Sequence, residues 1–159
     1  MIANNKRLQL IMEGNILLAY FSNTGNTEAV ATFIASEYYC DIEVITPERD
    51  YGKNISEIKK RLIRERDNPP PIKKPKYDIR QYSVVVIGTP VWNNDIPAPV
   101  KQYLIESDWR GKKIHPFFSY GGIYFNAYHS LISICKGASF GAPLFIKNDH
   151  NGNFIGACE

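Results

Sequence analysis

The feature that most constrains the fold is a set of short apolar runs that carry no charge and are separated by segments with helical periodicity. Residues 15–21 read Asn-Ile-Leu-Leu-Ala-Tyr-Phe and residues 83–88 read Ser-Val-Val-Val-Ile-Gly. Uncharged runs of this length are typical of strands in a parallel sheet, because such strands are buried on both faces. The chain is therefore expected to build an α/β domain around a central parallel sheet.

Strands and helices are expected to alternate along the rest of the chain. Further strands are predicted at residues 42–45, 113–118 and 142–146, and helices at 28–39, 54–66, 97–106 and 125–135. Right-handed crossovers turn this order into a doubly wound parallel sheet. The apolar faces predicted for three of the helices are Val30, Phe33, Ile34 and Tyr38 in the first, Ile55, Ile58, Leu62 and Ile63 in the second, and Tyr128, Leu131, Ile132 and Cys135 in the fourth.

The chain length of 159 residues fits a single domain. We predict an N-terminal extension at residues 1–14 and one domain at 15–159. No apolar run approaches the ~20 residues that span a membrane, and the first residues are too broken by charge to form a secretory signal. Three scattered cysteines, with no CxxC pair, are typical of reduced thiols in a cytoplasm.

The formal net charge of +3 is unevenly distributed. Residues 49–80 hold eleven Lys and Arg against five Asp and Glu, a local balance of 11 − 5 = +6. A basic patch can attract nucleic acid, but no RNA- or DNA-binding motif accompanies this one, and several prolines interrupt it. We interpret it as a solvated helix face followed by a stiff loop, and we expect no nucleic-acid partner.

The loop between the first strand and the first helix has the chemistry of a phosphate site. It reads Ser22-Asn23-Thr24-Gly25-Asn26-Thr27, with three hydroxyl groups and a glycine that permits a tight turn. The N-terminus of the following helix adds partial positive charge, which favours an anion. The loop has no lysine and no GxxxxGK[ST] pattern, so a nucleotide-hydrolysing P-loop is excluded. A turn and helix cap without a ligand is the alternative.

This loop and the strand before it resemble the flavodoxin family, whose first βα loop has the pattern [ST]-x-T-G-x-T. The resemblance implies a five-stranded sheet in the order 2-1-3-4-5 and a non-covalently bound FMN. By the same resemblance, Ser22, Asn23, Thr24, Asn26 and Thr27, around Gly25, would hold the FMN phosphate.

Two later loops complete the resemblance. The segment Thr89-Pro90-Val91-Trp92-Asn93 is similar to the Gly-Thr/Tyr-Pro-x-Trp stretch of one flavodoxin branch, where an aromatic plane lies beside the flat isoalloxazine ring. The segment Ser119-Tyr120-Gly121-Gly122 follows the fourth strand, at the family's second isoalloxazine loop, and inserts Tyr120 where relatives have Ser-Gly-Gly. Tyr120, Tyr124 and Phe125 are candidates to cover the outer face of the flavin.

The chain departs from the family pattern in two places. Flavodoxins often have glycine beside the flavin N5, where a peptide flips on one-electron reduction, whereas this chain has Asn93-Asn94, for which a positive φ is less favourable. The chain also ends soon after the fifth predicted strand, so the last helix is expected to be missing or replaced. Either residues 5–13 or a second subunit in a symmetric dimer would then cover the exposed sheet face.

Three functions fit these features. The first is a single-domain electron-transfer carrier in which FMN supplies the redox chemistry. The second is an FMN-dependent NAD(P)H:quinone oxidoreductase with the same fold. The third is a non-catalytic interaction module that has lost its flavin. For the first two functions the expected partner is an unidentified redox protein or a quinone, and no membrane partner is expected.

Overall fold

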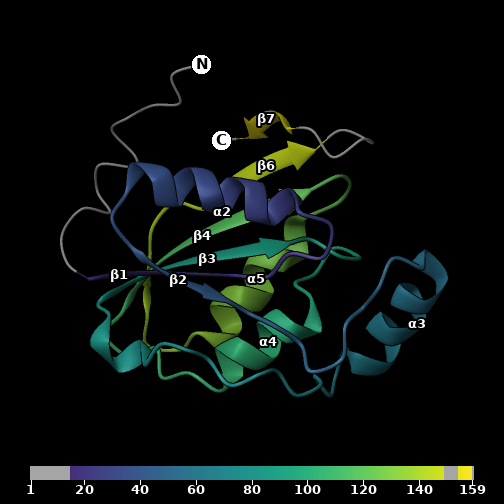
Figure 1. The fold of residues 1–159 in the computed structure, drawn as a ribbon, viewed down its shortest axis with the longest axis horizontal. Coiled ribbons are helices and arrows are strands. Elements are labelled where there is room, and N and C mark those ends of the chain that lie inside the picture. The colour runs from purple at the N-terminus through teal and green to yellow at the C-terminus, as the bar shows by residue number, and fades with distance from the viewer. Residues whose placement is uncertain (1–14, 149–153, 159) are drawn as a thin grey trace.

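The computed structural model describes residues 15–148 and 154–158, and these form one twisted sheet with helices on both sides (Figure 1). The strand order is β2-β1-β3-β4-β6-β7, and β5 pairs with β4 off this path. The strands are β1 (Ile16–Tyr20), β2 (Asp41–Val44), β3 (Val84–Pro90), β4 (Lys113–Tyr120), β5 (Ser139–Phe140), β6 (Leu144–Asn148) and β7 (Phe154–Cys158). The helices are α2 (Asn26–Glu37), α3 (Ile55–Glu65), α4 (Ala98–Ile105) and α5 (Phe125–Ile134), with a 3₁₀ turn, η2, at Ile79–Gln81.

The predicted order 2-1-3-4-5 is confirmed, with the fifth strand broken into two pieces. β5 pairs with the first residues of β4 and β6 pairs with the last ones, both in parallel. The sequence missed the β5 piece. It also did not predict β7, which pairs antiparallel with β6 at the edge of the sheet.

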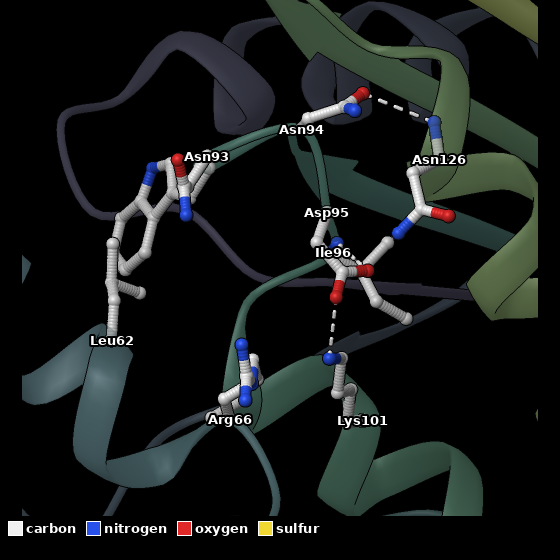
Figure 2. A pocket seen from close by; sticks show the side chains of 10 residues that line it. Leu62, Arg66, Asn93, Asn94, Asp95, Ile96, Lys101 and Asn126 are labelled. Carbon is white, nitrogen blue, oxygen red and sulfur yellow. Dashed lines mark hydrogen bonds and ion pairs between the residues drawn. The ribbon is translucent and has the colours of Figure 1, made fainter.

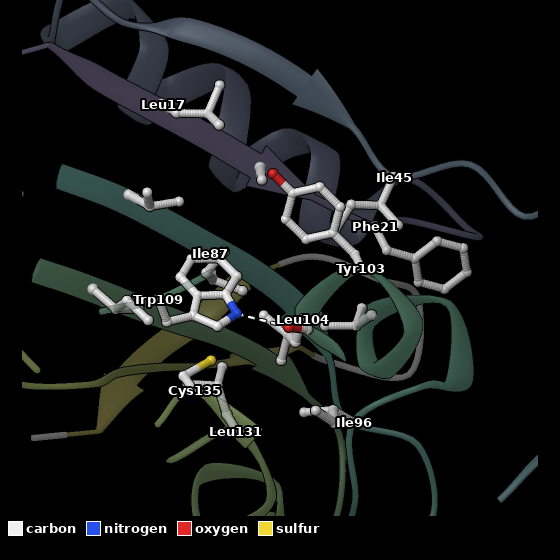
Figure 3. Packing of buried hydrophobic residues seen from close by; sticks show 14 of the residues in the cluster. Leu17, Phe21, Ile45, Ile87, Ile96, Tyr103, Leu104, Trp109, Leu131 and Cys135 are labelled. Atoms are coloured by element: carbon white, nitrogen blue, oxygen red, sulfur yellow. Dashed lines mark hydrogen bonds between the residues drawn. The ribbon is translucent and has the colours of Figure 1, made fainter. Parts of the chain in front are cut away.

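The central strands are buried on both faces, as their composition predicted. On one face α4 and α5 pack over a core that contains Trp109, whose Nε1 donates a 2.7 Å hydrogen bond to the Leu104 carbonyl (Figure 3). On the other face α2 packs over side chains of β1, β3 and β4, among them Leu18, Val86 and Phe117. In the described ranges no helix is long and apolar enough to cross a bilayer.

Coverage of the α2 face is incomplete at its sides. Among the described residues α2 is the only helix that contributes buried side chains to this face. The last helix of the fold was expected to be missing or replaced, and in the described part of the chain the strand β7 follows β6. Phe33, predicted on the apolar face of α2, is therefore 57% exposed. Ile132 of α5 is likewise 37% exposed, because only part of its helix face meets the sheet. The alternative cover at residues 5–13 lies outside the described residues.

Strand β2 buries a charged residue between two exposed apolar ones. Ile42 and Val44 are 41% and 50% exposed on the poorly covered α2 face, whereas Glu43 is only 6% exposed. The Glu43 carboxylate accepts a 2.9 Å hydrogen bond from the backbone N–H of Tyr77. A hydrogen-bonded carboxylate can be buried at an edge strand, and it stabilises the segment that leads into β3.

Helix α3 was predicted with its isoleucines inward and its basic residues outward, and this is wrong at its most buried residue. Arg61 is 6% exposed, while Ile55 and Ile63 are 69% and 77% exposed. The helix stands apart from the sheet, on the side where the strands end (Figure 1). Ile58, on the predicted apolar face, still packs against the core of the α4/α5 face, while Arg61 makes polar contacts to the segment before the helix.

Candidate functional site

The loops that follow β1, β3 and β4 meet at the carboxyl ends of these strands and enclose a cavity of about 200 Å³. In an open α/β sheet this edge is where ligands bind. We call this space the loop cavity. Its lining residues are Ser22, Asn23, Thr24, Asn26, Thr27, Pro90, Val91, Trp92, Ser119, Tyr120, Gly121 and Asn148.

The first loop ends in a helix N-terminus that no side chain caps. Gly25 is the N-cap residue of α2 with φ +97°, a left-handed conformation that glycine adopts without strain. Its N–H donates to the Ser22 hydroxyl at 3.1 Å, and α2 has no side-chain cap hydrogen bond. The N–H groups of the first turn of an uncapped helix are available to an external acceptor, and the helix dipole favours an anionic one.

A buried pair of hydroxyl groups joins the first loop to the end of β4. The Oγ1 of Thr27 and the Oγ of Ser119 lie 2.7 Å apart, and the two residues are 1% and 2% exposed. This hydrogen bond links residues 92 positions apart in the chain. It fixes the two loops relative to each other at the base of the loop cavity.

The loop after β3 is a two-residue hairpin turn. The N–H and carbonyl of Trp92 bond the carbonyl and N–H of Asp95 at 2.8 and 3.0 Å. Asn93 and Asn94, the central residues, have φ values of +51° and +62°. Positive φ at both central residues defines a type I′ turn, in which asparagine is favoured.

The sequence led us to expect that a positive φ would be less favourable at Asn93 and Asn94 than at glycine. Both residues nevertheless adopt a positive φ and form the turn without glycine. Reversing the peptide between Asn93 and Asn94 would convert the turn to type II′, which has glycine at the first central position. The side chain of Asn93 disfavours that second form. The peptide is therefore held in one orientation.

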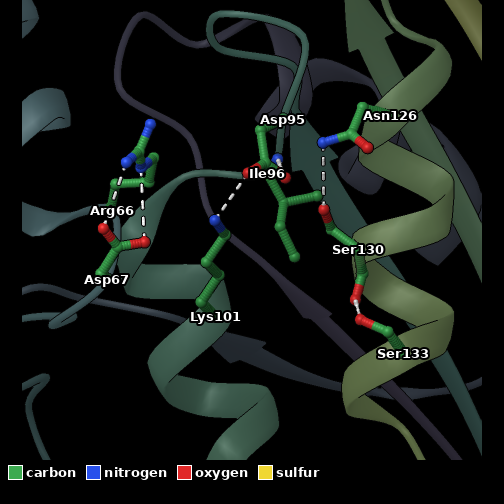
Figure 4. A network of polar contacts seen from close by, with 8 residues as sticks. All are labelled: Arg66, Asp67, Asp95, Ile96, Lys101, Asn126, Ser130 and Ser133. Atoms are coloured by element: carbon green, nitrogen blue, oxygen red, sulfur yellow. Dashed lines mark hydrogen bonds and ion pairs between the residues drawn. The ribbon is translucent and has the colours of Figure 1, made fainter.

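Side chains on both flanks hold this turn in place. The Asn94 Oδ1 accepts a 3.0 Å hydrogen bond from the Asn126 N–H in the first turn of α5 (Figure 2). Asp95 pairs with Lys101 of α4 at 2.6 Å, and its other oxygen accepts from the Ile96 N–H at 2.8 Å (Figure 4). The turn is consequently anchored to two helices on the α4/α5 side.

The Trp92 ring belongs to an aromatic cluster that connects the site to α3. Its centroid lies 5.5 Å from that of Phe21 and 5.2 Å from that of Tyr51, both in edge-to-face geometry. The guanidinium of Arg61 lies 3.8 Å from the Tyr51 centroid, and the Tyr51 hydroxyl donates to Glu65. Burial, followed by the Glu65 hydrogen bond, raises the pKa of Tyr51 well above its usual range, so the hydroxyl stays protonated.

The loop after β4 leaves open space beside its glycines. An added Cβ at Gly121 or Gly122 would meet no atom within 4 Å. Of the three candidate aromatic residues, Tyr120 is 5% exposed and lines the loop cavity, and its ring lies 4.3 Å from that of Tyr124. Phe125 is 69% exposed at the start of α5.

Five of the residues proposed from the sequence do not line the loop cavity. Gly25 shapes the helix start, Thr89 is fully buried with its hydroxyl bonded to the Pro90 carbonyl, and Asn93 faces a second cavity. Gly122 and Tyr124 lie farther along their loop and are absent from the lining residues.

Asn148 is the lining residue that the sequence analysis missed. It ends β6, and its Oδ1 is buried with no hydrogen-bond partner among residues 15–148 and 154–158. An unpaired buried acceptor is costly, so a ligand donor in the cavity would stabilise it. The available signal was its place after the last predicted strand, the same edge at which the other loops lie.

None of the described residues that line the loop cavity is charged. An anion bound there would be held by neutral hydroxyl, amide and backbone N–H groups together with the dipole of α2. Within the described part of the chain, no group of three or more His, Cys, Asp or Glu is arranged to hold a metal ion. The site is suited to a ligand with a phosphate and a flat ring.

A second cavity of about 220 Å³ is bordered by the Trp92–Asp95 turn (Figure 2). Leu62 and Arg66 of the α3 region, Lys101 of α4 and Asn126 of α5 line it, and Trp92 lines both cavities. Trp92 therefore stands between the loop cavity and the surface formed by α3.

The comparison with protein families agrees with this geometry. The sequence model of the flavodoxin family matches residues 15–141, which include all three loops. The chain belongs to the flavodoxin family. No curated protein sequence matches this flavodoxin-family chain.

Solved structures of flavoproteins share its fold. A flavoprotein from Lactobacillus acidophilus, solved in complex with FMN, is 19% identical with a TM-score of 0.72, and the alignment covers 83% of this chain and 93% of that one. A protein from Bacteroides eggerthii, provisionally described as a flavoprotein, is 28% identical with a TM-score of 0.71, covering 82% and 88%. A similarly described protein from Bacteroides uniformis is 23% identical with a TM-score of 0.75, covering 84% and 90%.

Proposed function

We propose that this flavodoxin-family protein binds FMN in the loop cavity and acts as a single-domain electron-transfer carrier. The observation that carries the proposal is the convergence of an uncapped α2 N-terminus, the Trp92 turn and the glycine loop on one cavity. When bound, FMN would supply one- and two-electron redox chemistry. The residues present fit such a group, because the cavity offers neutral donors to a phosphate and open space beside Gly121 to a ring.

The chain's own residues would bind and orient the cofactor. Ser22, Thr24 and Thr27 would donate to the phosphate, beside the N–H groups of α2. Trp92 and Tyr120 would flank the ring, and the backbone of Pro90, Val91 and Ser119 would face its polar edge. The buried Oδ1 of Asn148, which has no partner in the described ranges, would accept a hydrogen bond from the cofactor.

We propose residues 15–159 as the cofactor-binding domain, in a cytoplasmic protein whose partner is a redox protein or a quinone. A symmetric dimer that covers the α2 face remains part of this proposal. It is supported by the exposed Ile42 and Val44 and by the exposed Phe33.

Flavin titration of the purified apoprotein, followed by stopped-flow reduction, tests the function. A carrier should bind FMN, take electrons from a reduced redox protein and react slowly with NADPH. Rapid oxidation of NADPH with a quinone as acceptor would instead indicate an NAD(P)H:quinone oxidoreductase. Absence of FMN binding would indicate a non-catalytic interaction module.

A further inference from the structure

The outer side of α3 carries two exposed isoleucines that alternate with basic residues. Ile55, Lys59, Ile63 and Arg66 follow one another at i, i+4, i+8 and i+11, so they lie along one side of the helix. All four are exposed, and the isoleucines are 69% and 77% exposed. We call these four residues the α3 stripe.

The exposure of the α3 stripe is fixed by the buried side of the helix. Arg61 donates to the carbonyls of Asp50 and Arg49 at 2.6 and 3.1 Å and to the Glu65 carboxylate at 2.9 Å. The Glu65 contact lies within α3, but rotating the helix to bury its isoleucines would break the two hydrogen bonds from Arg61 to the carbonyls of Arg49 and Asp50. The apolar side chains are therefore held outward, where a partner could cover them.

The α3 stripe lies next to the proposed cofactor site. Arg66 belongs to the stripe and also lines the second cavity, as does Leu62, the residue before Ile63 (Figure 2). Trp92 lines that same cavity and the loop cavity. A protein bound to the stripe would thus contact the turn that separates it from the flavin.

The charge of this surface indicates the chemistry of its partner. Residues 49–80 hold eleven basic against five acidic residues. In the part of the chain that the structure describes, Lys59 has no carboxylate partner, and Arg66 pairs only with its exposed neighbour Asp67 at 3.2 Å (Figure 4). A partner with exposed carboxylates would be attracted over a distance of about 10 Å at moderate ionic strength.

We propose that the α3 stripe docks an acidic one-electron-transfer protein, and this rests on the proposed function. Carboxylates of the partner would face Lys59 and Arg66, while its apolar centre would cover Ile55 and Ile63. In each encounter the partner is oxidised by one electron and the carrier is reduced by one electron. The stripe has no aromatic side chain for base stacking, and its apolar part is interrupted by Lys59, so a nucleic acid or a membrane fits it less well.

Stopped-flow mixing of the FMN-loaded protein with a reduced acidic [2Fe–2S] ferredoxin tests this docking. Lys59→Glu with Arg66→Glu should lower the second-order rate constant at least about tenfold at low ionic strength. The matched control is Arg110→Glu with Lys136→Glu, which makes the same charge change at exposed residues near the opposite strand ends. That control should lower the rate less than about twofold, because steering depends on the local charge.

An NMR titration supplies a readout that does not depend on electron transfer. Oxidised ferredoxin should shift the amide signals of α3 and of the Trp92 turn, and Ile55→Ser with Ile63→Ser should weaken the complex without changing its salt dependence. The same titration on the apoprotein tests docking even where FMN fails to bind, a failure that would instead defeat the proposed function.

Several results would overturn the docking proposal. Equal slowing by both charge-reversed pairs would assign the effect to overall charge. A rate that does not depend on ionic strength, or no transfer from the acidic carrier, would remove the electrostatic basis. Binding of anionic vesicles or single-stranded DNA by the α3 stripe, with no amide shifts from ferredoxin, would assign the surface to another kind of partner.

Discussion

The hydrogen bond between Thr27 and Ser119 allows the structural and ligand-binding roles of one hydroxyl to be separated. Thr27→Val keeps the side-chain shape and removes Oγ1, which leaves the Ser119 hydroxyl, 2% exposed, without its 2.7 Å partner. An unsatisfied buried hydroxyl should lower the free energy of unfolding by about 1–3 kcal/mol. Thr27→Val with Ser119→Ala removes both polar groups, so most of that stability should return.

Binding of FMN should not return in the double variant. A hydroxyl that donates to a charged phosphate contributes roughly 1.5–3 kcal/mol, which corresponds to a loss of about 10- to 150-fold in affinity. Riboflavin lacks the phosphate, so its affinity should fall less than about threefold on the same reasoning. Thr24→Val is the matched control, because Thr24 is exposed and the loss of its hydroxyl should weaken FMN binding without a cost in stability.

Urea denaturation and flavin fluorescence titration measure the two effects independently. Equal losses of FMN and riboflavin affinity would refute the placement of the phosphate in the first loop. Recovery of FMN affinity in the double variant would show that the Thr27 hydroxyl acts only through Ser119.

Four further outcomes are expected. Flavin should quench the fluorescence of Trp92 but not that of Trp109, which is buried and hydrogen-bonded to the Leu104 carbonyl. Quenching that survives in Trp92→Phe would place the flavin ring elsewhere. Arg61→Lys retains the charge but loses the guanidinium's contacts to two carbonyls and a carboxylate, so the free energy of unfolding in urea should fall by about 2–4 kcal/mol. An unchanged urea midpoint would contradict the role of Arg61 in holding α3. Burial and the charge of Lys113 lower the pKa of His115, so at mildly acidic pH the unfolded chain binds a proton that the folded chain does not. The free energy of unfolding should therefore fall as the pH drops below about 6.5. The variant His115→Phe should remove this pH dependence. If a second subunit covers the α2 face, deleting residues 1–12 should leave a stable dimer by light scattering, whereas aggregation would favour the N-terminal segment as the cover.

The sequence was sufficient for the features that are encoded within a few neighbouring residues. Three segments have a local composition that is compatible with few kinds of local structure: the uncharged strand at Val84–Pro90, the Ser22–Thr27 loop and the glycines at 121 and 122. Because parallel strands end at one edge of the sheet, the order of these segments also predicted that their loops would converge. It did not reveal Asn148, since an amide after an edge strand has no distinctive local pattern.

Tertiary structure decided which side of the peripheral elements is buried. The apolar periodicity of α3 predicted inward isoleucines and outward basic residues, yet Arg61 is its most buried residue, and Glu43 is buried between two exposed apolar residues of β2. Their hydrogen-bond partners include the N–H of Tyr77 and the carbonyl of Asp50, at sequence separations of 34 and 11 residues. Periodicity shows that a segment has two faces, but which face is buried depends on the surface that the rest of the chain presents to it. At the edge of this sheet that surface is polar backbone, and it stabilises a carboxylate and a guanidinium better than an isoleucine.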